Sequence, residues 1–274
     1  MNYRHIYHAG NFADVVKHLI LITILEQLKK KEKPFAVLDG FAGIGIYDLN
    51  LEAAQKTSES VTGIKKLLDF TSSFSNIHSN HSSVPHILQL FLDIVNTTST
   101  DHYPGSPLII TKLLRPHDRL IASELHSADY LSLKNLLGET ANIHNLDAYK
   151  AVKAFVPFKE KRGLIFLDPP FEVKNEFDKL LEVITEIKSR ALNNCVLIWY
   201  PIKDRSLVRD FYHNYKDMGF KETLIIEYEL LHSDKNMVKC GLMIINPPNI
   251  KDDLAQLTEY LTAALNLKFT YNYL

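Results

Sequence analysis

The chain has 274 residues, of which 46% are hydrophobic and 23% are charged, and its formal net charge is −1 at pH 7. This length fits one large α/β domain or a domain with an insertion. The most apolar helical stretch, Leu19 to Leu25, is far shorter than the ~20 residues of a transmembrane helix. The two cysteines are too few for a disulfide scaffold, and no histidine or cysteine spacing matches a metal site. We therefore expect a cytoplasmic protein without membrane or metal partners, whose charge neither proves nor excludes a nucleic-acid substrate.

Predicted strands and helices alternate along the chain. The first helix is predicted over residues 11–31, because Asn11 is a good N-cap, apolar residues recur on one face, and Pro34 stops the pattern. A buried strand over 35–39 follows, and further strands are predicted over 120–124, 142–146, 163–167, 195–200, 223–228 and 242–245. Helical patterns lie between most of these strands, over 107–114, 128–137, 149–155, 176–192, 206–218 and 252–264. This alternation predicts an α/β fold with a mostly parallel, doubly wound sheet.

One interval breaks the alternation. After Asp39, the next predicted strand ends in an acid only at Glu124, whereas a nucleotide-binding βαβ unit places its second acid about 20 residues after the glycine turn. We therefore expect residues 51–103 to form an inserted helical subdomain within a single domain of residues 1–274.

A glycine-rich turn follows the first predicted strand. The segment Asp39–Gly45 reads D-G-F-A-G-I-G, and glycines allow positive φ angles and the close approach of a ligand to the backbone. The dinucleotide pattern G-x-G-x-x-G fails, because Asp48 stands where its third glycine would be. A small adenosyl ligand therefore fits better than a pyrophosphate, with an ordinary β–α turn as the alternative.

Two more acids end the strands that follow. Glu124 and Asp147 come at the ends of the next two predicted strands, and a carboxylate there can accept hydrogen bonds from both hydroxyls of a ribose. Any one of these acids could simply be a helix N-cap. Three acids in succession, with Asp39 as the first, favour a ligand crevice at this edge of the sheet.

The most specific motif is Asp168-Pro169-Pro170-Phe171, directly after an apolar strand. Two prolines fix φ and remove two backbone donors, so the strand cannot continue regularly. Carbonyl groups and the Asp168 carboxylate can then accept both hydrogens of an adenine N6 amine, and Phe171 can stack on the base. The alternative is a plain strand terminator, which is our interpretation of the similar segment 246–249, N-P-P-N, because it lacks the aromatic residue.

These motifs resemble the amino-methyltransferase superfamily, in which a D-x-x-x-G-x-G turn precedes a [DNS]-P-P-[FYW] segment. Residues 3–18, which read Y-R-H-x-x-H-A-G-N-x-A-D-V-x-K-H, narrow the resemblance to the bacterial ribosomal large-subunit adenine-N6 methyltransferase J family. Residues 103–107 (Y-P-G-S-P), 124–126 (E-L-H) and 199–201 (W-Y-P) are similar to that family too. The resemblance covers almost the whole chain and implies a Rossmann-like class I methyltransferase fold.

The resemblance also implies a reaction. A methyl group would pass from S-adenosylmethionine to the exocyclic N6 amine of one adenosine in 23S ribosomal RNA, with the RNA naked or at an early assembly stage and the enzyme a monomer. Asp168 would meet the reacting amine within the catalytic segment Asp168, Pro169, Pro170 and Phe171. Cofactor contacts are implied or expected for His18, Asp39, Gly40, Phe41, Gly43, Ser106, Glu124, Asp147, Ala148 and Asp168.

The basic, aromatic N-terminus is expected to cover the catalytic cleft. There Tyr3 would stack on RNA, Arg4 would add a charge and Lys17 would contact phosphate. Each role also has a simpler alternative: Lys17 could be solvated, Ser106 could be an N-cap before Pro107, and His18 could pair with Asp14 on one helix face.

The chain departs from the family pattern at three positions. Phe41 stands where the family has histidine, so one cofactor contact is in doubt; Ala148 replaces a common glycine; and Phe171 replaces tyrosine but keeps the ring. The D-P-P-F motif does not distinguish sugars, so a DNA adenine methyltransferase is the nearest alternative. A protein-glutamine methyltransferase and a non-catalytic RNA-binding protein with a vestigial cofactor fold are weaker alternatives.

Overall fold

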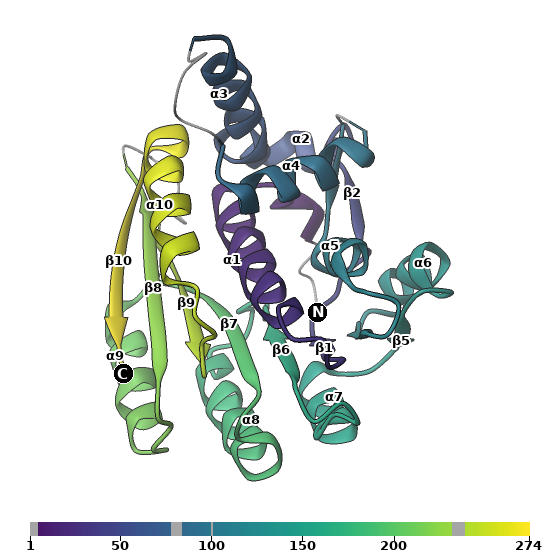
Figure 1. Ribbon diagram of the computed structural model, residues 1–274, viewed down its shortest axis with the longest axis vertical. Helices are drawn as coiled ribbons and strands as arrows, with labels where there is room; N and C mark the ends of the chain where they lie inside the picture. Colours follow the sequence, from purple (N-terminus) through teal and green to yellow (C-terminus); the bar gives the residue numbers. More distant parts are fainter. Residues whose placement is uncertain (1–4, 78–83, 100, 232–238) are drawn as a thin grey trace.

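Eight strands form one sheet in the order β10-β8-β9-β7-β6-β1-β4-β5, which Figure 1 shows from left to right. The computed structural model describes residues 5–77, 84–99, 101–231 and 239–274. The strands are β1 (Ala36–Asp39), β4 (Arg119–Ser123), β5 (Asn142–His144), β6 (Gly163–Leu167), β7 (Cys195–Pro201), β8 (Thr223–Leu230), β9 (Lys239–Ile245) and β10 (Leu267–Tyr273).

Most strands of the sheet run in one direction. Strands β5, β4, β1, β6 and β7 pair in parallel, whereas β9 is antiparallel to both of its neighbours, β7 and β8. The predicted, mostly parallel α/β sheet is therefore confirmed. The edge strand β10, antiparallel to β8, was not predicted, and β5 ends at His144, before the predicted end at residue 146.

Helices cover both faces of this sheet. Figure 1 shows α1 and α10 over one face and α8 and α9 over the other. The helices outside the interval 51–103 are α1 (Phe12–Lys29), α5 (Ser106–Leu113), α6 (Ser127–Leu137), α7 (Ala148–Phe155), α8 (Glu176–Ala191), α9 (Arg205–Lys216) and α10 (Lys251–Leu265). The sheet is therefore doubly wound, as predicted.

The strand sequences explain the two layers, because alternate side chains of a strand point to opposite faces. In β1, Val37 joins the core on the α1 side, and Leu38 joins the core on the α7–α8 side. In β6, Phe166 and Leu167 divide in the same way. Because both faces are covered, the central strands read as continuous apolar runs.

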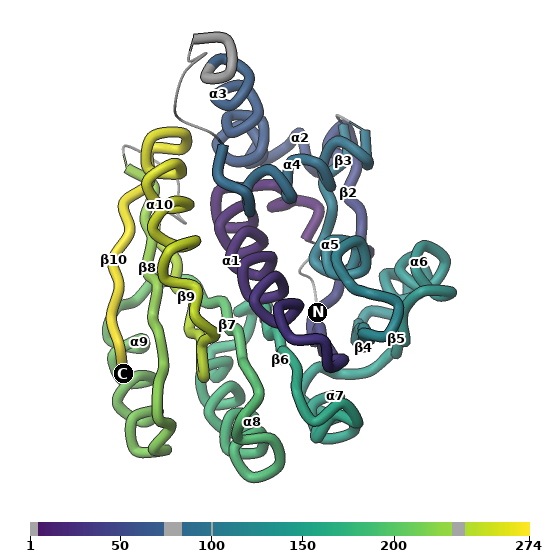
Figure 2. Tube along the Cα trace, in the orientation of Figure 1, coloured from purple at the N-terminus to yellow at the C-terminus, as the bar shows by residue number. Residues whose placement is uncertain are grey.

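The interval between β1 and β4 leaves and re-enters the domain through a two-stranded ribbon of β2 (Ile46–Asp48) and β3 (His102–Pro104). It contains α2 (Glu52–Thr57), α3 (Ile64–Ile77) and α4 (His86–Thr97), which Figure 2 places at the upper end of α1. Leu67 of α3 and Phe91 of α4 belong to the same core as α1. The definition of residues 51–103 as a subdomain stays a proposal.

Candidate active site

A cavity of about 780 Å³ lies at the carboxyl ends of the parallel strands. Its walls come from η1 (His5–Tyr7), the start of α1, and the turns after β1, β4 and β6. Of the residues predicted as functional, those that line it are Lys17, His18, Gly40, Phe41, Gly43, Ser106, Glu124, Asp147, Ala148, Asp168, Pro169, Pro170 and Phe171. Tyr3 and Arg4 lie outside the described residues.

The glycine turn follows β1 and is held by hydrogen bonds to the ends of the neighbouring strands β6 and β4. The N–H of Gly40 donates to the Phe166 carbonyl over 3.0 Å, and the N–H of Gly43 donates to Oε2 of Glu124 over 2.9 Å. Gly43 has a φ of +62°, and a Cβ there would approach the Tyr47 hydroxyl to 2.1 Å. The turn therefore requires glycine for both its conformation and its space.

Asp39 does not line the cavity, so the predicted direct cofactor contact is corrected. Its side chain is fully buried, where Oδ2 accepts a 2.7 Å hydrogen bond from the Ser106 hydroxyl and Oδ1 has no partner among the described residues. Burial, with the nearby charge of Asp168, raises the pKa of Asp39 to about 7. Ser106 is the first residue of α5 and Gly105 is its N-cap, so Ser106 supports Asp39 instead of capping the helix.

Glu124 directly follows β4 and has both carboxylate oxygens fixed. Oε2 accepts the hydrogen bond from Gly43, and Oε1 accepts one of 2.7 Å from the N–H of His126. Burial raises the pKa of Glu124 above its ordinary value. The carboxylate therefore has a set orientation at the cavity wall.

Asp147 caps a helix instead of ending a strand. It is the N-cap of α7, where its Oδ1 accepts a hydrogen bond of 3.1 Å from the N–H of Lys150. This was the simpler alternative for this acid, yet Asp147 and Ala148 also line the cavity. The methyl of Ala148 would lie 3.2 Å from a Cβ placed on Gly40, so the start of α7 lies close to the turn after β1.

The turn Asp168–Phe171 leaves the end of β6 abruptly. Phe171 has a φ of +50°, a backbone conformation that costs a bulky residue about 1–3 kcal/mol and is characteristic of functional sites. Its ring makes an edge contact with Trp199, at 6.1 Å between centroids, and with Phe177, at 5.0 Å. An aromatic surface therefore adjoins Asp168 in the cavity.

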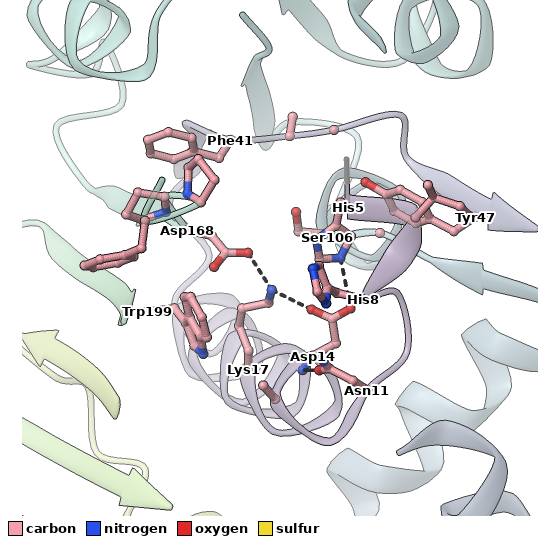
Figure 3. A pocket seen from close by; sticks show the side chains of 18 of the residues that line it. His5, His8, Asn11, Asp14, Lys17, Phe41, Tyr47, Ser106, Asp168 and Trp199 are labelled. Atoms are coloured by element: carbon pink, nitrogen blue, oxygen red, sulfur yellow. Dashed lines mark hydrogen bonds and ion pairs between the residues drawn. The ribbon is translucent and has the colours of Figure 1, made fainter. Parts of the chain in front are cut away.

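Lys17 links the first helix to this turn (Figure 3). Its Nζ lies 2.5 Å from Oδ2 of Asp168 and 2.7 Å from Oδ1 of Asp14, and it lies 5.8 Å from the centroid of the Trp199 ring. Burial opposes the charge, but the two carboxylates outweigh it and raise the pKa of Lys17. The prediction that Lys17 contacts RNA phosphate is corrected, because its side chain is only 4% exposed.

His18 makes its side-chain hydrogen bond with Tyr103, and no hydrogen bond or ion pair joins it to Asp14 among the described residues. Its Nδ1 makes a 2.8 Å hydrogen bond with the Tyr103 hydroxyl, and the two rings stack at 5.5 Å. Burial lowers the pKa of His18 to about 3. The ring is therefore neutral at pH 7, with one nitrogen able to donate and the other able to accept.

Sequence reasoning assigned no role to three residues that the cavity brings together: His5, Asp14 and Trp199. The sequence did contain a signal for them, because His5 and Asp14 belong to the motif over residues 3–18 and Trp199 belongs to the motif over residues 199–201.

The interpretation of segment 246–249 as a strand terminator is confirmed: β9 ends at Ile245, and the amide of Asn246 donates to the carbonyls of Leu192 and Asn194.

Two further findings concern the described part of the chain. Within it, no group of three or more His, Cys, Asp or Glu side chains is arranged to hold a metal ion. Nor does any described helix combine the length and the apolar character needed to cross a membrane.

Comparison with known proteins identifies the family. A family model described as "Ribosomal RNA large subunit methyltransferase D, RlmJ" matches residues 32–271. Ribosomal RNA large subunit methyltransferase J of Haemophilus influenzae is 34% identical over 97% of this chain and 94% of its own length, and the protein of that name from Escherichia coli is 35% identical over 90% and 88%. The crystal structure of protein LPL1258 from Legionella pneumophila is 30% identical and covers 97% of this chain and 98% of its own, with a TM-score of 0.84. The chain therefore has the Rossmann-like class I methyltransferase fold and belongs to the ribosomal RNA large subunit methyltransferase J family.

Proposed function

We propose that this protein transfers a methyl group from S-adenosylmethionine to the N6 amine of an adenosine in 23S ribosomal RNA. One observation carries the proposal: the Lys17–Asp168 ion pair lies at the proline-fixed turn, in the same cavity as Glu124 and the glycine turn. The relatives from H. influenzae and E. coli are ribosomal RNA large subunit methyltransferases, which supports an RNA substrate and a cytoplasmic location.

The residues of the cavity fit S-adenosylmethionine. A volume of about 780 Å³ lies within the ~300–1,000 Å³ typical of ligand pockets, and the fixed carboxylate of Glu124 suits the two hydroxyls of a ribose. Further contacts would come from the backbone of the glycine turn and from His18, Phe41, Ser106, Asp147, Ala148 and Asp168. When bound, this cofactor supplies an electrophilic methyl group on a sulfonium.

Asp168 and the carbonyl groups of its turn would hold the adenine. Oδ2 of Asp168 already accepts from Lys17, and Oδ1 accepts no hydrogen bond from the described residues, so Oδ1 is the oxygen available for an amine hydrogen. The Pro169 carbonyl region would accept the second hydrogen, and Phe171 would stack on the base. The adenine amine is uncharged at pH 7, so no prior deprotonation is needed. As the methyl group arrives, N6 would release one hydrogen as a proton, which Oδ1 of Asp168 would accept.

An adenosine within folded RNA must leave its stack to reach this cavity, at a cost of a few kcal/mol. The edge contact between Phe171 and Trp199 offers the flipped base an aromatic surface in exchange. Tyr3 and Arg4 stay proposed RNA contacts, whereas we now propose that Lys17 acts inside the site. We further propose a monomer acting on naked or early-assembly RNA.

The experiment that tests the proposal offers the protein labelled S-adenosylmethionine with one of three substrates: naked 23S ribosomal RNA, duplex DNA or assembled large subunits. Label in naked RNA alone supports the proposal. Label in DNA instead would select the DNA adenine methyltransferase, and cofactor binding without transfer to any substrate would indicate a vestigial fold.

A further inference from the structure

Asp14 lies in the cavity wall, at the centre of a polar network with His5 and Lys17, although nothing in the proposed reaction requires it to touch substrate. It is in the first turn of α1 and is 2% exposed. Its Oδ2 accepts hydrogen bonds from Nε2 of His5 at 2.9 Å and from the N–H of Gly10 at 3.0 Å, and its Oδ1 accepts one of 2.7 Å from Lys17. A buried carboxylate with this many donors is a fixed anion.

Helix capping does not explain this arrangement. The N-cap of α1 is Asn11, whose Oδ1 accepts a 2.9 Å hydrogen bond from the N–H of Asp14. The free N–H groups at a helix start attract an anion, but this attraction alone does not require contact with a buried lysine. The Asp14–Lys17 contact therefore needs a separate explanation.

The contact fixes where the Lys17 ammonium lies. Lysine has a long, flexible side chain that carries a point charge, and one carboxylate partner leaves it several positions. With Asp14 on one side and Asp168 on the other, Nζ is confined between them, as Figure 3 shows. The ring of Trp199, 5.8 Å away, lines a third side.

The position of Lys17 determines how Asp168 meets a substrate. Lys17 binds Oδ2 and so leaves Oδ1 as the available acceptor. Because Lys17 is shared between two carboxylates, it neutralises less of the charge of Asp168 than it would in a pair with Asp168 alone. Hydrogen bonds to a charged acceptor are about twice as strong as neutral ones, so the second carboxylate keeps Asp168 a strong acceptor.

We propose that Asp14 is a positioning residue for methyl transfer, which holds Lys17 against Oδ2 of Asp168 so that Oδ1 faces the amine. Asp14 acts through Lys17 and does not contact substrate or cofactor. This inference rests on the proposed function, because it assigns a role within the same site.

The first test is Asp14→Asn, which keeps the shape but removes the charge. We expect kcat for 23S ribosomal RNA to fall at least about tenfold, while KM and the Kd for S-adenosylmethionine stay within about threefold. The matched control is Asp118→Asn. Asp118 is a buried carboxylate that pairs with Arg115 near the start of β4, at the opposite end of the strands, so its loss should reduce stability and leave kcat unchanged.

The second test separates an action through Lys17 from any other action. Lys17→Met removes the ammonium, and adding Asp14→Asn to that variant should lower kcat no further. Asp14→Asn alone leaves the buried Lys17 ammonium with one partner fewer, whereas the double variant carries neither charge, so it remains informative if Asp14→Asn alone does not fold. Wild-type kcat in Asp14→Asn, or the same fold loss with and without Lys17, would overturn the inference. If the wild-type protein methylates no RNA, the proposed function fails instead.

Discussion

Lys17 and Asp168 are 151 positions apart in the sequence, yet Nζ of Lys17 lies 2.5 Å from Oδ2 of Asp168. The contact joins the first helix to the turn after β6, at the carboxyl ends of the parallel strands. It also divides the two oxygens of Asp168: one binds the protein, and the other is available to a substrate.

Asp168→Ala should abolish methyl transfer while changing the Kd for S-adenosylmethionine only a few-fold, because the carboxylate is at the reacting end of the cavity. Asp168→Asn should keep part of the activity, since it still offers an acceptor oxygen. Single-turnover transfer to 23S ribosomal RNA measures the first effect and calorimetry the second. Wild-type turnover by the alanine variant would contradict the catalytic assignment.

Glu124→Ala should weaken binding of S-adenosylmethionine by roughly 2–3 kcal/mol, the scale of a lost pair of charge-assisted hydrogen bonds. Glu124→Gln keeps one acceptor oxygen and should lose less. Titration calorimetry on variants shown to be folded checks both values. An unchanged affinity in Glu124→Ala would exclude Glu124 from the ribose site.

Asp39→Asn should change stability in a pH-dependent way. Because burial raises the pKa of Asp39 from 3.8 to about 7, the folded state holds an extra proton between these values, and Asp39 destabilises the fold progressively as the pH rises through them. Asp39→Asn should therefore be more stable relative to wild type at pH 8 than at pH 5, that is, its unfolding free energy should exceed that of wild type by more at pH 8.

Denaturant unfolding at pH 5 and pH 8 checks this difference. Asp118→Asn is the control, because the pKa of Asp118 lies below its ordinary value: its burial is outweighed by hydrogen bonds from Arg115 and Phe35. Asp118 thus stays ionised in both states across this pH range, and the effect of Asp118→Asn should be constant. If the stability difference between Asp39→Asn and wild type were also the same at both pH values, Asp39 would be ionised in the folded state across this pH range.

Phe171→Leu should lower kcat/KM by an amount equivalent to about 1–3 kcal/mol of lost transition-state stabilisation, which is the free energy of stacking on one base. Phe171→Tyr keeps the ring and should retain most activity. Leucine at position 171 would have to adopt the same positive φ as phenylalanine, so the difference between Phe171→Leu and Phe171→Tyr reports on the aromatic ring. Equal kcat/KM for the leucine and tyrosine variants would show that the ring does not bind the base.

Much of the fold could be predicted because the central strands are buried on both faces. Runs such as residues 163–167 and 195–200 are continuously apolar and are separated by helical patterns. Strand β10 was missed because an edge strand faces solvent: most of its residues are exposed or half-buried. The short strands β2 and β3 are stabilised by pairing with each other, which a local pattern does not reveal.

The site could be predicted where it depends on strand ends. Glu124 and Asp168 follow the ends of β4 and β6, and a parallel sheet brings such positions to one edge. The roles of Asp39 and Lys17 could not be predicted, because they depend on tertiary contacts. Asp39 turns inward to Ser106, and Lys17 is buried by two carboxylates, one of them far along the chain.

The most direct test of the proposed activity is the identity of the methylated nucleoside. Unmodified 23S ribosomal RNA is incubated with the purified protein and S-adenosylmethionine, digested to nucleosides and analysed by mass spectrometry, with Asp168→Ala as the blank. We expect about one equivalent of N6-methyladenosine per RNA molecule in the wild-type reaction and none in the blank. A methyl group on a ring carbon, on a ribose or on another base would contradict the proposed activity.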